Sequence, residues 1–76
     1  MYIVVEGLDI PNTNEWWPSD EWSFYDLRRD IVKILTNKTG SDEDYNILVD
    51  NYVVNYSDNV VDTLNTGDVV VITRNK

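Results

Sequence analysis

Apolar positions near the middle of the chain repeat with the period of an α-helix. After Ser23 they follow one another at spacings of three, four, three and one, at Phe24, Leu27, Ile31, Ile34 and Leu35. This spacing predicts a helix over residues 24–37 with one face in the core. Ser23 followed by Asp26 is close to a capping box at its start. The basic side chains of Arg28, Arg29 and Lys33 are predicted to face solvent.

Short apolar runs bounded by Gly, Pro, Asp and Asn occupy the rest of the chain, which is the pattern of β-strands. They predict strands at residues 1–5, 13–17, 45–49, 52–54 and 69–73, the second of them irregular. Asp50 and Asn51 form the turn between the third and fourth strands. Val60, Val61 and Leu64 are predicted to form a loop or short 3₁₀ turn that plugs the core.

The last strand is the predicted centre of the sheet. Four apolar β-formers follow one another at residues 69–72, which suits a strand covered on at least one face. Gly67 can take a positive φ in the preceding turn, and Asp68 can bond back to nearby backbone. Because a strand–helix–strand crossover requires parallel pairing, the first and last strands are predicted to be parallel neighbours.

Composition and charge narrow the function classes. The 76 residues make one domain, residues 1–76, and they include neither cysteine nor histidine. The net charge of −8 repels nucleic acid and anionic membranes, so we expect a protein partner, with no direct nucleic-acid binding and no membrane association. No signal peptide or membrane span is recognisable, which predicts a cytoplasmic protein. We also expect the protein to be a monomer or a weak homodimer.

The residue types in the sequence do not favour catalysis. Nucleophilic catalysis by cysteine or general base catalysis by histidine is impossible, and the isolated glycines cannot form a phosphate-binding loop. Residues 42–46 resemble the start of a calcium loop, but Ile47 and Val53 stand where that loop needs glycine and glutamate. The sequence therefore predicts no enzyme, no catalytic residue, no metal and no cofactor.

Several segments resemble ubiquitin and its relatives. Residues 1–5 are similar to the opening strand of ubiquitin, residues 18–20 to the entry of its helix, and residues 47–54 to its third strand, turn and fourth strand. Residues 64–72 also resemble the ending of the small sulfur-carrier proteins. The resemblance implies an α+β, ubiquitin-like β-grasp fold of order ββαβββ, in which one helix packs across a mixed sheet.

One departure from these relatives concerns the C-terminus. Ubiquitin-type modifiers and sulfur carriers end in Gly-Gly, whereas this sequence ends Thr73-Arg74-Asn75-Lys76. We therefore expect no C-terminal conjugation or thiocarboxylate chemistry unless the natural product extends beyond Lys76. A carrier or modifier relative without the Gly-Gly tail stays open as an alternative.

Three tryptophans within seven residues are the most unusual local feature. A strand would place Trp16 and Trp17 on opposite faces, so that one enters the core and the other is exposed or covered by the loop after it. One possibility is that Trp16, Trp17 and Trp22 all close the edge between helix and sheet. The other is that one of them anchors a partner, since tryptophan is enriched in binding hot spots.

The outer face of the sheet is the second candidate surface. If alternate residues of the strands point at the helix, then Val4, Leu48, Val69 and Val71 point away from it. The resemblance to ubiquitin places Leu8, Leu48 and Val71 where partners grip an apolar patch. Alternatively, Tyr2 and Tyr52 cover this face.

Two functions from different classes follow. The first is a non-enzymatic ubiquitin-like interaction module that binds protein through Leu8, Leu48 and Val71, extended by Val4 and Trp17. The second is an acidic inhibitor, of a type known from viruses, that mimics nucleic acid toward a host enzyme. Its phosphate-like array would comprise Asp42, Glu43, Asp44, Asp50, Asp58 and Asp62.

Overall fold

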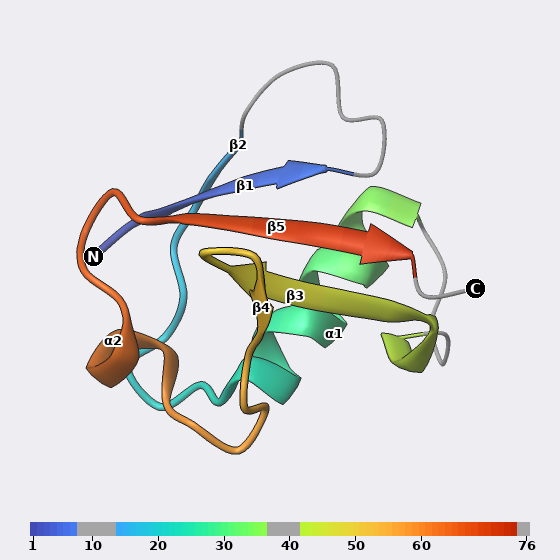
Figure 1. Ribbon diagram of the computed structural model, residues 1–76. Helices are drawn as coiled ribbons and strands as arrows, with labels where there is room; N and C mark the ends of the chain where they lie inside the picture. The colour runs from blue at the N-terminus through green and yellow to red at the C-terminus, as the bar shows by residue number, and fades with distance from the viewer. Residues whose placement is uncertain (8–13, 37–41, 75–76) are drawn as a thin grey trace.

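The computed structural model of the protein describes residues 1–7, 14–36 and 42–74. Over these residues a five-stranded sheet lies against the longest helix, α1 (Figure 1). The elements in chain order are β1 (Ile3–Gly7), β2 (Asn14–Trp16), α1 (Phe24–Thr36), the 3₁₀ helix η1 (Asp42–Asp44), β3 (Tyr45–Val49), β4 (Tyr52–Val53), α2 (Val60–Thr63) and β5 (Val69–Arg74). This order confirms the predicted ββαβββ arrangement, and a single α-helical turn forms where the sequence predicted a loop or 3₁₀ turn.

The sheet has the strand order β2-β1-β5-β3-β4, so the last strand is central, as predicted. β1 runs parallel to β5 with Val5 beside Val70, and β3 runs antiparallel to β5 with Ile47 beside Ile72. The short strands β2 and β4 form the two edges. Short edge strands leave few unpaired backbone groups, which limits edge-to-edge aggregation.

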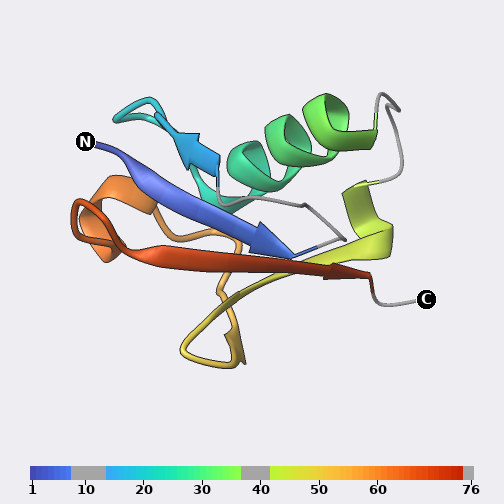
Figure 2. The ribbon, with the colours of Figure 1, turned by 90° about the horizontal axis from the view of Figure 1, so that it is seen from above.

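The hydrophobic core fills the space between one face of the sheet and α1. Figure 2 shows α1 on one side of β1 and β5. Alternate residues of the strands enter this core, as the period-2 pattern predicts. The core residues are Ile3, Val5, Trp16, Phe24, Leu27, Ile31, Val32, Tyr45, Ile47, Val60, Leu64, Val70 and Ile72.

The first turn of α1 carries the predicted capping box. The backbone N–H of Ser23 donates to Oδ2 of Asp26 at 3.0 Å, and the backbone N–H of Asp26 donates back to Oγ of Ser23 at 3.4 Å. These bonds satisfy backbone donors that a helix start leaves without intrahelical partners.

Two residues of α1 lie on the opposite side from the one predicted. Ile34, placed on the buried face by its spacing, is 61% exposed, and Arg28, placed in solvent by its charge, is only 6% exposed. The core face is centred on Phe24, Arg28 and Ile31, and it extends to Val32. Hydropathy alone misplaced the centre of the buried face of α1, because it counted Ile34 as apolar and Arg28 as polar.

The turn before β5 has the predicted chemistry. Gly67 has φ +85°, and Oδ2 of Asp68 accepts from the backbone N–H of Asn65 at 2.9 Å. Backbone bonds from Gly67 to Tyr2 and from Val4 to Asp68 then join this turn to the beginning of β1. The turn therefore sets the register of the central parallel pair.

Candidate interaction surfaces

The face of the sheet turned away from α1 carries a row of apolar side chains. Residues directly opposite each other in neighbouring strands share a face, and the register pairs Val4 with Val69, Leu48 with Val71, and Leu48 with Val53. Val69 is 42% exposed and Val53 54% exposed. We call this row, Val4, Val69, Val71, Leu48 and Val53, the outer stripe. It crosses β1, β5, β3 and β4.

Trp17 stands exposed beside the outer stripe. Its side chain is 65% exposed, and its ring centroid lies 5.7 Å from that of Tyr2, two residues before Val4. Trp16 instead enters the core, which confirms that the two tryptophans face opposite ways. The alternative that all three tryptophans close the edge between helix and sheet is therefore wrong for Trp17.

The predicted tyrosine cover of this face is only partly present. Tyr2 lies against Trp17, whereas Tyr52 pairs with Val49, whose side chain packs against the core, and not with the outer stripe. Leu8, which the resemblance placed in the patch, lies outside the described residues. Of the predicted contact residues, the structure thus brings Val4, Leu48 and Val71 together, with Trp17 close to Tyr2.

Two carboxylates that the sequence reasoning missed lie on the same face. Glu15 stands opposite Val4 across the β1–β2 pair, and Glu6 stands beside Val71 across the β1–β5 pair. Their alternation with Trp16 and Val5 was visible in the sequence, but only the register shows which apolar residues they neighbour. The outer stripe is therefore bordered by negative charge.

The acidic residues of the proposed phosphate-like array do not form one cluster. Asp42, Glu43 and Asp44 form η1, while Asp58 and Asp62 lie just before and within α2. Figures 1 and 2 both show α2 and the yellow-green η1 at opposite ends of the molecule. Asp50 belongs to the turn between β3 and β4. The array is divided into separate groups.

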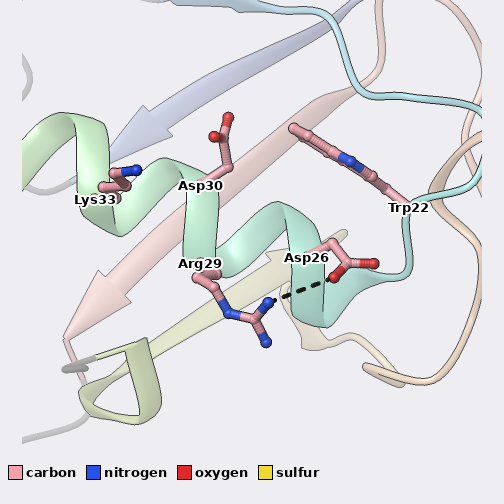
Figure 3. Close-up of a pocket in the computed structure, with 5 residues that line it drawn as sticks. All are labelled: Trp22, Asp26, Arg29, Asp30 and Lys33. Carbon is pink, nitrogen blue, oxygen red and sulfur yellow. Dashed lines mark ion pairs between the residues drawn. The ribbon is translucent and has the colours of Figure 1, made fainter. Parts of the chain in front are cut away.

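A shallow pocket of about 210 Å³ lies on the solvent side of α1. Figure 3 shows the Trp22 indole extending over the start of the helix toward Asp30. Arg29 pairs loosely with Asp26, N to O 3.8 Å, and Lys33 completes the lining. Oδ2 of Asp30 accepts from Nε1 of Trp16 at 2.8 Å. Two carboxylates and two cations line this pocket, so it has no net preference for either sign of charge.

Neither a metal centre nor a membrane helix emerges from the geometry. Within residues 1–7, 14–36 and 42–74, no three His, Cys, Asp or Glu side chains are grouped so that they could hold a metal ion. No helix in these same segments is long and apolar enough to cross a membrane.

Comparison with known proteins gives a likeness of structure only. No family model matches the sequence, and no curated protein matches it. Among solved structures, the chain is similar to the NMR solution structure of a computationally designed protein based on the template of human erythrocytic ubiquitin. The TM-score is 0.77 at 16% sequence identity, and the match covers 99% of this chain and 91% of the designed one. Together with the strand order and the single long helix of the described residues, this likeness shows that the chain has the ubiquitin-like β-grasp fold.

Proposed function

We propose that this protein is a non-enzymatic interaction module that binds a protein partner through the outer stripe, extended by Trp17. The observation that carries the proposal is the exposure of Val53, Val69 and Trp17 on one side of the molecule. Contiguous apolar surface on a small soluble domain marks a binding site more often than chance exposure does.

The residue types also fit a binding surface. Tryptophan is enriched among hot-spot residues, where truncation costs about 2 kcal/mol of binding free energy or more. The neighbouring valines are β-branched and held in a sheet, so they lose little rotamer freedom when a partner covers them. Trp17 would act as the anchor, and the outer stripe would supply the flat apolar area around it.

A pair of matched variants tests the proposal. The partner is first captured with the wild-type chain and then titrated against Leu48→Asp and Ile34→Asp. Both changes replace an apolar side chain by a carboxylate. Ile34, however, is exposed on α1 and lies away from the outer stripe. We expect Leu48→Asp to weaken binding at least about tenfold, which corresponds to 1.4 kcal/mol, and Ile34→Asp to leave it unchanged.

The fold of each variant is checked by heteronuclear NMR before binding is measured. Val71→Lys, a change of opposite charge on the same surface, should weaken binding as Leu48→Asp does if apolar contact is the cause. Wild-type affinity for both variants with an intact fold would exclude this face as the binding site.

The nucleic-acid mimic receives less support, because its acidic residues lie at separate places in the fold. It stays a prediction, which strong salt dependence of binding to a basic enzyme would favour. Location in the cytoplasm likewise stays a prediction, testable by cell fractionation and immunoblotting.

A further inference from the structure

We infer that the partner is basic as well as apolar where it meets the outer stripe, with Lys or Arg side chains placed against Glu6 and Glu15. The inference rests on the proposed function, because it names the chemistry of the partner at the same surface. Both carboxylates lie in register with members of the outer stripe, Glu15 with Val4 and Glu6 with Val71. Neither carboxylate has a hydrogen-bond or ion-pair partner among the described residues.

The described basic side chains all lie elsewhere in the fold. Arg28 is buried against tyrosine rings, and Arg29 and Lys33 are exposed on α1 beside the pocket of Figure 3. Arg74 donates from Nη2 to the Tyr45 hydroxyl at 3.2 Å, a bond that raises the pKa of Arg74. Tyr45 is a core residue, so this contact holds Arg74 away from the outer stripe. Within the described chain, the outer face of the sheet therefore combines apolar side chains with carboxylates and carries no basic side chain.

A second copy of this chain fits such a face poorly. In a symmetric dimer the same patch meets itself, so Glu6 and Glu15 of each copy would face a surface that carries carboxylates and no basic side chain. Each copy also carries a net charge of −8, which adds long-range repulsion. A partner of opposite charge instead gains attraction on approach and pairs each carboxylate on contact.

On this face the partner can contact only side chains. β5 lies between β1 and β3, and its backbone groups are paired to strands on both sides. Addition of a strand from the partner is open only at β2 and β4, the two edges of the sheet. On the outer face, a partner can therefore bind by apolar contact with the outer stripe and by ion pairs to Glu6 and Glu15.

Two double variants of equal net charge test the inference. Glu6→Gln/Glu15→Gln removes the two carboxylates beside the outer stripe. Asp58→Asn/Asp62→Asn removes two exposed carboxylates near α2, so both variants raise the net charge by the same amount. With the captured partner at low salt, we expect the first to weaken binding about tenfold and the second by less than about twofold. The first should also reduce the dependence of affinity on salt.

A defined probe locates the effect. A synthetic amphipathic Lys/Leu peptide and a Glu/Leu peptide of the same pattern are titrated into the isotope-labelled chain. We expect the Lys/Leu peptide to shift the amide signals of Val4, Leu48, Val69 and Val71, and the Glu/Leu peptide to leave them in place. Shifts confined to η1 and α2 would overturn the inference, because they would show attraction to the other acidic groups only.

The outcomes separate this inference from the proposed function. If Leu48→Asp abolishes partner binding while Glu6→Gln/Glu15→Gln binds like the wild type, the face is the site and the basic partner is wrong. Equal weakening by the two double variants would also overturn the inference, since net charge alone would then account for it. Normal binding by Leu48→Asp would overturn the proposed function itself.

Discussion

The guanidinium of Arg28 lies 4.1 Å from the centroid of the Tyr56 ring, inside the protein and not on its surface. The Tyr25 ring stacks on Tyr56 at 5.4 Å, and Nη1 of Arg28 donates to the backbone carbonyl of Tyr45 at 3.3 Å. Its Nε has no hydrogen-bond partner. Arg28 thus joins α1 to the segment after β4 by its flat shape, while part of its hydrogen-bonding capacity is unused.

Replacing Arg28 should separate the effect of its shape from that of its charge. Arg28→Ala leaves a gap beside the tyrosine rings and should lower the free energy of unfolding by about 2–3 kcal/mol. Arg28→Met fills most of that volume without a buried charge, so it should lie within about 1 kcal/mol of the wild type. Urea unfolding followed by far-UV circular dichroism measures both. A methionine variant as unstable as the alanine variant would show that the charge itself stabilises the fold.

The hydrogen bond from Trp16 to Asp30 joins β2 to α1, and Asp30→Ala should weaken that connection. The indole N–H would lose its acceptor in a partly buried site, which should lower the free energy of unfolding by about 1–2 kcal/mol. Glu21→Ala, an exposed acidic residue before the helix, is the control and should change stability by less than about 0.5 kcal/mol. A double-mutant cycle with Trp16→Phe should give a coupling near 1 kcal/mol, and additive effects would contradict the bond.

Gly7 and Gly67 both have positive φ, at +108° and +85°, but their surroundings differ. A Cβ at Gly7 would clash with the carbonyl oxygen of Ile72, whereas one at Gly67 would meet the Tyr2 hydroxyl at an ordinary 3.5 Å. Gly7→Ala should therefore cost about 3 kcal/mol or more, because β1 and β5 must separate, and Gly67→Ala only about 1 kcal/mol of backbone strain. Thermal unfolding of the two variants compares them directly, and equal losses would contradict the close approach.

The turn between β3 and β4 should accept glycine at Asn51. Asp50 and Asn51 have φ of 52° and 71°, and Val49 pairs with Tyr52, which is the geometry of a two-residue hairpin turn with both central residues left-handed. Asn51→Gly should raise the free energy of unfolding by about 0.5 kcal/mol, and Asn51→Ala should lower it by about 1 kcal/mol. Denaturant midpoints of the three chains test the order, and a stabilising alanine would contradict it.

Local features of the fold were predictable because their causes lie within a few residues of each other. The capping box of Ser23 and Asp26, the turn at Gly67 and Asp68, and the period-2 strands each depend on neighbouring side chains and backbone angles. The central place of β5 followed from its continuous apolar run and from the parallel pairing that a strand–helix–strand crossover requires. For these features, hydropathy and turn chemistry carry enough information.

The candidate surface was predictable only in part. Alternation along each strand predicted that Val4, Leu48, Val69 and Val71 point away from α1, and the register confirms that they form one row. That Glu6 and Glu15 border this row depends on the pairing of β1 with two other strands. Sequence spacing does not give the register of β1 with β5, because these two strands are far apart along the chain.

By itself, the sequence determined the order of strands and helices, the caps and turns, and which side of each strand enters the core, since these follow from local periodicity and backbone preferences. The tertiary structure alone decided that Arg28 is buried and Ile34 exposed, and that apolar and acidic side chains meet on the outer face. The physical reason is that burial depends on what packs against a residue. For Arg28 that is the Tyr56 ring, which comes from a segment that no local pattern places beside the helix.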